Sequence, residues 1–337
     1  MTAIVPIDLL DPGELSRAQA WLEVHTAAER HLYGAAASVW GLGEILEFHR
    51  QPDTRRVSWA AIEDDVIVGA AEIVEGLRDN LDSARIWISV LPQRRGRGIG
   101  GALVEVVESA GRRDGRTIFQ TFTGAPPGQC DPSRRFAERR GYAASQTELR
   151  SGLSLPLDTG RLTALVEIAE PGGDPTAYRI ESHDGMPPDE WLPGLALLNR
   201  RMSTEAPMGA LDLEEEDWDE QRVRRREQSA LDAGRRVQSS VAREAGSGRL
   251  VGFTQLAVSA ETPTLAYQGA TLVLREHRGH RIGMRLKAAN VRALQAGLPE
   301  VSSIRTWNAE ENEPMLAVNR ELGFVVDSVD TAWQKKV

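Results

Sequence analysis

The sequence has few of the side chains that support covalent or metal-based chemistry. Cys130 is the only cysteine among 337 residues, which excludes an intrachain disulfide and a cysteine-based zinc site. The only lysines are Lys287, Lys335 and Lys336, so Schiff-base chemistry has few candidates. His277 and His280 have no carboxylate pair near them in the sequence, and we predict no metal site.

Long apolar runs and an excess of positive charge are also missing. No apolar stretch reaches the roughly 18 residues of a membrane-spanning helix, and Met1–Leu10 has no basic segment leading into an apolar one. We therefore expect a cytoplasmic protein without a membrane partner. The formal net charge of −9 argues against a nucleic-acid partner and weakly favours cationic small molecules or basic peptides.

The composition and the length are those of a globular chain with two domains. Hydrophobic residues make up 41% and charged residues 26% of the sequence, which is typical of chains that fold. A chain of 337 residues exceeds the length at which a single hydrophobic core stops growing. Two domains of ordinary size are therefore expected.

Three landmarks of the first half recur in the second half at nearly constant spacing. The matched pairs lie 183, 183 and 182 residues apart and are Ile67–Ala70 with Leu250–Phe253, Arg95–Gly100 with Arg278–Gly283, and Arg140–Tyr142 with Leu322–Phe324. Any one of these matches alone would carry little weight. Together they indicate an internal duplication.

The boundary between the two copies is expected where the first copy ends. Leu149–Leu157 is predicted to be a final strand, Arg161–Glu170 a short helix and Pro171–Pro175 a cluster of helix breakers. The predicted organisation is a first domain over 1–157, a connecting helix and linker over 158–175, and a second domain over 176–337.

Each copy shows the same order of helical and extended patterns, which predicts two α/β domains of the α+β type with mixed sheets. The expected helices are Leu15–Arg30, Ile99–Arg112, Ser133–Arg140, Trp191–Met202, Ile282–Ala296 and Glu313–Leu322. The expected strands are Val57–Ile62, Val66–Val74, Ile86–Leu91, Thr117–Phe122, Val237–Arg243, Leu250–Val258, Ala270–Leu274 and Ser303–Trp307. The acidic stretch Leu211–Arg236 has no clear match in the first copy, and we expect it to form one or two helices added over the second site.

The most informative feature is a strand that runs into an arginine- and glycine-rich loop and then into a helix. In Ile88–Gly100 (ISVLPQRRGRGIG) the glycines let successive N–H groups face one concavity, beside the positive end of the helix dipole. Such a concavity fits a pyrophosphate. One loop of this kind could equally be a simple connection, but its recurrence at Arg278–Gly283 favours binding. A Walker loop is excluded because Gly-Lys-Ser/Thr is absent, and a Rossmann loop because its glycine pattern and βαβ unit are absent.

The loop resembles the coenzyme loop of the GNAT superfamily, which reads Gln/Arg-x-x-Gly-x-Gly/Ala after a strand. Arg95–Gly100 matches this pattern fully, whereas in Arg278–Gly283 the first of the paired glycines is replaced by Arg281. This replacement leaves the path of the second loop open. The resemblance covers nearly the whole chain and implies two tandem GNAT acyl-CoA N-acyltransferase domains, similar to mycothiol synthase-like two-domain acetyltransferases, with acetyl-CoA as cosubstrate.

The resemblance also implies which residues would contact the coenzyme. Strand residues would hold the acyl oxygen with backbone N–H groups, and loop residues would hold the pyrophosphate. In the first copy these are Ile88, Ser89, Val90, Arg95, Gly96, Arg97, Gly98, Ile99, Gly100 and Gly101. In the second copy they are Leu272, Val273, Leu274, Arg278, Gly279, His280, Arg281, Ile282, Gly283, Asn308 and Asn312.

The sequence leaves the acid and base of the reaction open. The family's usual general acid is a tyrosine, but Ala137 and Asn319 stand at its two positions. A general base is needed because amines are mostly protonated at neutral pH, and water could serve instead of a side chain. The candidate catalytic residues, each of which could also be a solvated or packing residue, are Glu205, Glu310 and Tyr267, with Glu311 as a further base.

We expect catalysis in the second copy, because it retains the asparagines and because its acidic stretch could enclose a substrate and exclude water. The first copy would then bind acetyl-CoA or serve as a scaffold. Met202–Met208 either lines the substrate site or is a helix end stopped by Pro207. The expected function is acetyl-CoA-dependent N-acetylation of a small-molecule amine by direct transfer, in a monomer or homodimer. The alternatives are a protein or peptide N-acetyltransferase and a catalytically silent acyl-CoA-binding sensor.

Overall fold

The computed structural model of the chain describes residues 2–168, 174 and 176–337. Most of the expected breaker cluster at 171–175 lies outside these residues. The chain forms two compact units. Unit 1 comprises the chain up to Thr147 together with Gly209–Leu211 and Ser328–Val337, and unit 2 comprises Glu148–Met208 and Asp212–Asp327.

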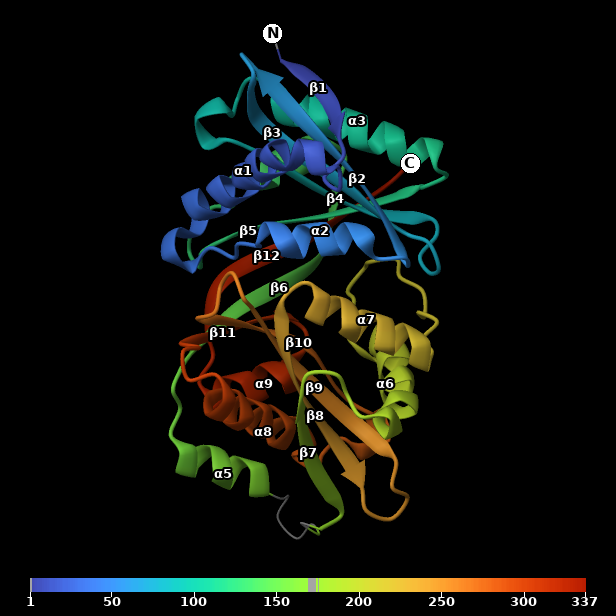
Figure 1. The fold of residues 1–337 in the computed structure, drawn as a ribbon, viewed down its shortest axis with the longest axis vertical. Helices are drawn as coiled ribbons and strands as arrows, with labels where there is room; N and C mark the ends of the chain where they lie inside the picture. Colours follow the sequence, from blue (N-terminus) through green and yellow to red (C-terminus); the bar gives the residue numbers. More distant parts are fainter. Residues whose placement is uncertain (1, 169–173, 175) are drawn as a thin grey trace. The chain divides into compact units, whose positions relative to one another are not determined.

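The same order of elements occurs twice, which confirms the predicted mixed α/β fold (Figure 1). The first series is β1 (Ala3–Ile7), α1 (Leu15–Tyr33), α2 (Leu42–Arg50), β2 (Thr54–Glu63), β3 (Val66–Gly76), β4 (Ser83–Val90), α3 (Ile99–Arg113), β5 (Ile118–Ala125), α4 (Arg134–Arg139) and β6 (Ala143–Ser154). After α5 (Thr159–Glu167), the second series is β7 (Tyr178–Asp184), α6 (Leu192–Glu205), α7 (Glu220–Asp232), β8 (Arg235–Glu244), β9 (Leu250–Ser259), β10 (Leu265–Val273), α8 (Ile282–Gly297), β11 (Ser303–Ala309), α9 (Glu313–Leu322) and β12 (Val325–Lys336).

Each unit completes its sheet with the last strand of the other sequence half. In unit 1 the strand order is β1-β2-β3-β4-β5-β12, and in unit 2 it is β7-β8-β9-β10-β11-β6. β12 runs antiparallel to β5 from Val329 to Lys336, and β6 runs antiparallel to β11. Figure 1 shows the red β12 beside the green β5 in unit 1. In each unit only the fourth and fifth strands of the series, β4 with β5 and β10 with β11, pair in parallel.

This exchange makes the compact units differ from the contiguous ranges 1–157 and 176–337 expected from the repeat. The alternation of side chains along a strand predicts which face is buried, but it does not predict which sheet edge the strand joins. The sequence pattern therefore located β6 at the end of the first copy without revealing that it completes the sheet of unit 2.

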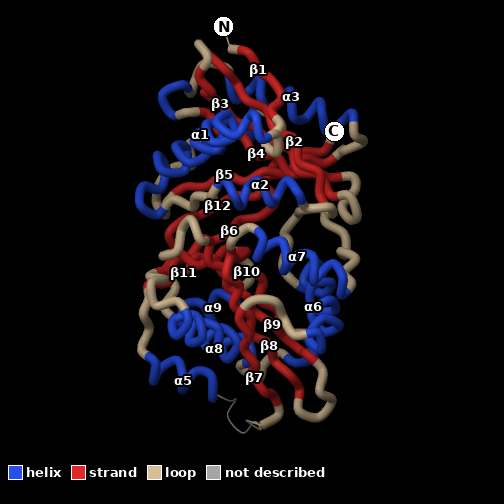
Figure 2. The backbone as a smooth tube through the Cα atoms, viewed as in Figure 1, coloured by secondary structure: helices blue, strands red, loops and turns tan. Residues whose placement is uncertain are grey.

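Helices cover both faces of each sheet and bury its apolar side chains (Figure 2). On one face of unit 1, Ile99, Leu103, Val107 and Ala110 follow one another along α3 at helical spacing and pack against Phe119 on β5. On the other face, α1 buries a second cluster around Trp21. In unit 2 the corresponding clusters form beneath α6 and beneath α8. None of the described helices is both long and apolar enough to cross a membrane.

The acidic stretch does have a counterpart in the first half. It contains one helix, α7, which occupies the same place between α6 and β8 as α2 does between α1 and β2. Residues 211–219 before it are not helical. The expectation of an added element was wrong, because a loop longer than its counterpart hid the match. No helix or strand was predicted from the sequence at α2, β1, β7 or β12.

The segment Met202–Met208 is largely a helix end. α6 continues to Glu205, and Ala206 ends the helix in an extended conformation one residue before Pro207. This is the geometry expected when proline stops a helix. The structure therefore agrees with the second of the two interpretations of this segment.

Candidate functional site

In unit 1 the arginine- and glycine-rich loop has the backbone of an anion-binding turn. β4 ends at Val90, a single 3-10 turn follows at Pro92–Arg94, and α3 begins at Ile99. Gly96 and Gly98 have φ of 76° and 87°, a region that side chains disfavour. Because the first N–H groups of a helix have no partner within it, those at the start of α3 are available to an anion at this turn.

Beside this loop, β4 and β5 separate. Their parallel pairing runs from Ser83 with Ile118 to Arg85 with Gln120 and stops there. Beyond it β4 stays paired on its other side with β3, and the N–H of Leu91 donates to the carbonyl of Val68. The remainder of β4 therefore has one open backbone edge.

The open edge exposes alternate N–H groups. Since hydrogen bonding alternates along an antiparallel pair and Leu91 bonds to β3, the N–H of Ser89 also points to β3. The N–H groups of Ile88 and Val90 point into the gap. Of the three strand residues predicted in this copy, these two can bind an acyl oxygen through their backbone.

The loop arginine and the helix glycines have definite partners. Arg95 Nε donates to the Val90 carbonyl at 3.2 Å, and partial burial lowers its pKa. A Cβ at Gly101 would overlap the guanidinium of Arg140, the mobile end of a flexible side chain that follows α4. Arg97 is exposed.

The second loop follows the same path despite the arginine in place of glycine. After β10, a 3-10 turn spans Arg275–His277, Gly279 has φ of 89°, and α8 begins at Ile282. Arg281 has φ 58° and ψ 10°, so it takes the left-handed conformation of Gly98 at the same point before the helix. Its guanidinium donates to Glu321 Oε1 at 2.5 Å.

We expect Arg281→Gly to be more stable than Arg281→Ala by about 1 kcal/mol, because both variants lose the same ion pair and only alanine carries a Cβ in the left-handed region. Urea unfolding of the two variants measures the difference. Gly283→Ala, in the helical conformation two residues later, is the control and should be stabilising instead. If Arg281→Ala proved as stable as Arg281→Gly, the predicted backbone strain at this position would be wrong.

The second site exposes the same number of strand N–H groups. The parallel pairing of β10 with β11 stops at Tyr267 with Arg305, and a bulge lies between Gln268 and Thr271. The N–H of Leu274 donates to the Val251 carbonyl at 2.9 Å, so the alternation directs Leu272 to β9 as well. Of the three strand residues predicted here, only Val273 directs its N–H into the gap, and Thr271, which was not predicted, does so too.

The arginine of the second loop, Arg278, forms an ion pair with a carboxylate. Arg278 Nε donates to the Val273 carbonyl at 3.0 Å, as Arg95 does to Val90. Its terminal nitrogen also contacts Glu205 Oε2 at 2.8 Å. Glu205, a predicted base, is thus held by a guanidinium at the end of α6.

The other predicted catalytic residues lie on or just after β10 and β11. Tyr267 on β10 stacks on Trp307, with ring centroids 6.1 Å apart and planes 20° apart. Glu310 and Glu311 are exposed in the turn after β11. A catalytic role for any of the three stays a prediction.

The asparagines of the second half have structural partners. Asn308 Oδ1 accepts from Asn319 at 2.7 Å, and Asn319 Oδ1 accepts from Lys287 at 2.7 Å. Asn312 caps α9 by accepting from the Met315 N–H. Contact of Asn308 or Asn312 with a coenzyme stays a prediction.

The histidines of the second loop contact an aromatic ring. His277 Nδ1 lies 3.0 Å from the hydroxyl of Tyr178 on β7. The ring of His280 is 5.5 Å from that of Tyr178. The contact of His280 with a pyrophosphate stays a prediction.

Unit 1 contains a cluster of buried and partly buried polar side chains that was not predicted from the sequence. His25 on α1 contacts the Ser89 hydroxyl through Nδ1 at 2.8 Å. Nearby, Glu72 on β3 binds His49 at 2.7 Å and Arg56 at 2.6 Å. Burial raises the pKa of Glu72, but the hydrogen bond from His49 and the charge of Arg56 outweigh it, so the pKa is lowered overall. The only signal in the sequence was a polar residue within an apolar stretch, at Ser89 and again at Glu72.

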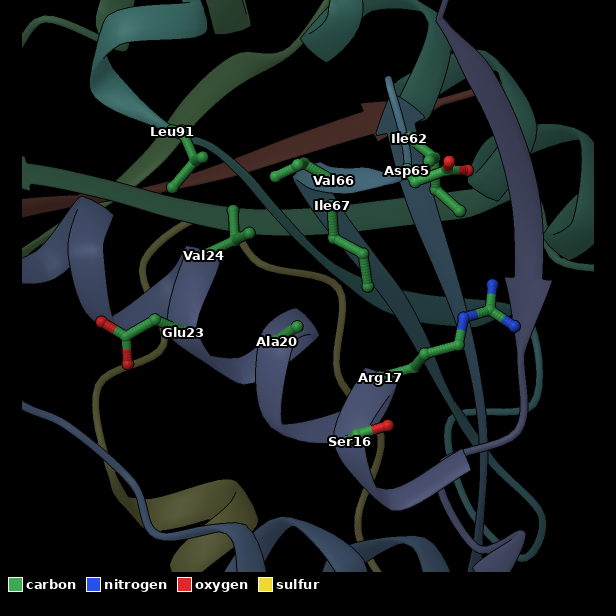
Figure 3. Close-up of a pocket in the computed structure, with 10 residues that line it drawn as sticks. All are labelled: Ser16, Arg17, Ala20, Glu23, Val24, Ile62, Asp65, Val66, Ile67 and Leu91. Atoms are coloured by element: carbon green, nitrogen blue, oxygen red, sulfur yellow. The ribbon is translucent and has the colours of Figure 1, made fainter. Parts of the chain in front are cut away.

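A pocket of about 690 Å³ lies between α1 and the sheet of unit 1 (Figure 3). Ala20 and Val24 on α1 face Ile67 and Leu91 across it. Leu91 follows Ser89 by two residues, so both side chains leave the sheet on the same face. The charged and polar lining residues are Ser16, Arg17, Glu23 and Asp65.

Comparisons with known proteins agree with this geometry. Residues 54–144 match the model of the acetyltransferase (GNAT) domain. No curated protein sequence matches the chain.

Solved structures resemble the chain over its whole length. A tandem GNAT protein from the clavulanic acid biosynthesis pathway is 27% identical with a TM-score of 0.79, covering 100% of this chain and 98% of that one. A GCN5-related N-acetyltransferase from Sphaerobacter thermophilus is 17% identical with a TM-score of 0.65, covering 99% and 95%. The N-myristoyltransferase of Saccharomyces cerevisiae is 11% identical with a TM-score of 0.60, covering 99% and 80%. The last two show the fold alone.

These similarities to known proteins agree with three features of the structure. The features are the duplicated order of elements, the two glycine loops and the separated strands beside each loop. Residues 54–144 thus match the GNAT acetyltransferase domain, and the fold of the whole chain is that of a tandem GNAT protein.

Proposed function

We propose that this chain transfers an acetyl group from acetyl-CoA directly to the amine of a small molecule. The observation that carries the proposal is the open edge of β4 next to the pyrophosphate-type turn of unit 1. A thioester whose pyrophosphate lies at Gly96–Gly101 could reach the N–H groups of Ile88 and Val90, which would stabilise the oxyanion that develops on the acyl oxygen. Donors of this kind change rates by roughly 10²–10³.

Two observations favour unit 1 as the site of the reaction, in contrast to the expectation that the second copy is catalytic. No described carboxylate is hydrogen-bonded to Arg95, whereas Arg278 is held by Glu205. The residues that match the GNAT domain all lie in the first half. We propose that unit 2 mainly serves as a scaffold.

The pocket of unit 1 supports a small, cationic acceptor. Asp65 places a carboxylate on its wall, whereas the other two charged lining residues are ion-paired, Glu23 with Arg30 at 3.8 Å and Arg17 with Glu14 at 2.6 Å. A protonated amine would be attracted to such a lining. The similar tandem GNAT protein also comes from a pathway that makes a small molecule.

Aromatic rings beside the gap support an acceptor with an apolar part. The side chains of Trp87 on β4 and Phe122 on β5 are 48% and 41% exposed. Exposed large aromatic side chains close to a site are typical of binding surfaces. They would hold the body of the acceptor while its amine approaches the thioester.

The proposal is tested with isotope-labelled acetyl-CoA and a panel of amines that includes amino acids, glucosamine and an aminoglycoside. Titration calorimetry gives the affinity and the number of coenzyme sites. Binding together with label transfer to one amine class supports the proposal. Binding without transfer to any amine would favour an acyl-CoA sensor, and transfer only to polypeptides would favour a protein acetyltransferase. No binding of acetyl-CoA at all would reject the proposal.

A further inference from the structure

A serine and a buried histidine meet at the open edge of β4. Ile86, Ile88 and Val90 pack into the cluster beneath α3, so Ser89 leaves the sheet on the opposite face, which α1 covers. There its hydroxyl lies 2.8 Å from His25 Nδ1. Ser89 also stands between the two N–H groups that face the gap, so its hydroxyl is next to the expected position of the acyl carbon.

The imidazole of His25 is largely buried. Its ring meets the edge of Trp21 at 4.5 Å between centroids. Its Nε2 is buried and has no hydrogen-bond partner among the described residues. A buried unpaired ring nitrogen costs about 1–3 kcal/mol, which a purely structural residue would not need to sustain.

His25 is neutral at pH 7. Burial lowers its pKa to about 4, and the charge of Glu72 on β3 opposes this shift. Glu72 is in turn bound by His49 on α2 and Arg56 on β2, so the charges nearest to the imidazole largely compensate each other. A neutral imidazole has one free ring nitrogen and can accept a proton.

We propose that Ser89 and His25 together carry the proton that the attacking amine must lose. This inference rests on the proposed function of unit 1. Ser89 is the catalytic residue, because its hydroxyl would touch the reacting amine. His25 is its positioning partner and acts only through Ser89, since its Nδ1 bonds to the Ser89 hydroxyl and its Nε2 is buried. The pair would take over part of the proton transfer for which neither half has the usual tyrosine.

The step balances without a further reagent. The acceptor first releases its ammonium proton to water. The nitrogen of the neutral amine then forms a bond to the acyl carbon while one of its remaining protons passes to Ser89 Oγ and the hydroxyl proton of Ser89 passes to His25 Nδ1. The carbon–sulfur bond then breaks, and the thiolate of coenzyme A leaves. The imidazolium, which is disfavoured in its largely buried site, returns the proton through Ser89 to the thiolate. The net result is an amide, a thiol and an unchanged pair.

The test compares Ser89→Ala, Ser89→Thr and His25→Asn with Ser83→Ala, a control at the other end of β4 whose hydroxyl bonds only to the Asn80 carbonyl. The assay uses labelled acetyl-CoA and the amine that the wild-type protein acetylates fastest. We expect Ser89→Ala to lower kcat about 100-fold with little change in the KM for acetyl-CoA, as removal of a proton-transfer group does. Ser89→Thr should recover most of the rate. His25→Asn retains a hydrogen bond to Ser89 but accepts no proton, and should resemble Ser89→Ala.

Each other outcome overturns the inference in a distinct way. If the wild-type protein transfers acetyl groups and Ser89→Ala is as active as Ser83→Ala, the relay is rejected while the proposed function stands. If His25→Asn retains full kcat, His25 does not accept the proton. An acetyl group found on Ser89 by mass spectrometry of the intact protein would replace the relay with a covalent intermediate. If the wild-type protein transfers no acetyl group, both the relay and the proposed function are rejected.

Discussion

Gly100→Glu is expected to weaken acetyl-CoA binding in unit 1 about 100-fold and to lower acetyl transfer at subsaturating coenzyme in proportion. Gly100 lies in the first turn of α3, where the pyrophosphate would bind. Two like charges about 4 Å apart near a protein surface repel by roughly 4 kcal/mol, part of which salt screens. The helix itself should tolerate the change, because glutamate is favoured in a first turn and a Cβ at Gly100 meets Phe136 at an ordinary 3.5 Å.

Gly283→Glu is the matched control at the equivalent position of α8, where a Cβ meets nothing within 4 Å. It should remove any coenzyme binding in unit 2 and leave acetyl transfer intact. Titration calorimetry and the transfer assay on both variants distinguish the two units. Loss of transfer in Gly283→Glu with full transfer in Gly100→Glu would place the reaction in the second copy, as the sequence analysis expected.

The free energy of unfolding of the wild-type protein should rise more steeply with pH than that of Lys287→Met between pH 7 and 10. Lys287 on α8 is buried, and desolvation lowers its pKa from 10.5 to about 7. Between these two values the unfolded chain binds more protons than the folded chain, so stability increases as the pH rises. The expected difference is on the order of 3–4 kcal/mol over this range, because each pH unit contributes up to about 1.4 kcal/mol.

Urea unfolding at several pH values measures both slopes, and their difference isolates Lys287 from the other groups that titrate in this range. The variant also leaves Asn319 Oδ1 without its lysine donor, which costs about 1–3 kcal/mol but does not depend on pH. The slope is therefore the informative quantity. Parallel slopes would mean that Lys287 stays charged in the folded protein.

The parts of the fold that the sequence predicted are those with local causes. Ile99, Leu103 and Val107 repeat at helical spacing, and the predicted helix over Ile99–Arg112 is α3 with one further residue. The turn before it needed residues with positive φ, which Gly96 and Gly98 supply at little cost. The path of the second loop could not be predicted in this way, because Arg281 stands where a glycine was expected. Only the structure shows that Arg281 takes the left-handed conformation that glycine usually takes.

Only the backbone groups of the candidate site were predicted from the sequence, and its side-chain contacts were not. The loop and the strand residues Ile88 and Val90 are recognisable because they lie in one continuous segment. His25 and Ser89 are 64 residues apart, and no spacing rule connects a helix residue to a strand residue at that distance. Glu205 looked like a free base for a similar reason, because its partner Arg278 is 73 residues away.

By itself the sequence determined the duplication, the glycine loops and the mixed α/β fold, because repeats, backbone torsions and the periodicity of apolar residues are properties of neighbouring residues. Only the tertiary structure decided that β6 and β12 each complete the sheet of the unit formed mainly by the other half of the sequence. It also decided that alternate N–H groups of β4 remain open and that a histidine contacts Ser89. These features depend on which distant segments pack together, since a strand edge or a buried ring nitrogen acquires its partner, or lacks one, only when the chain is folded.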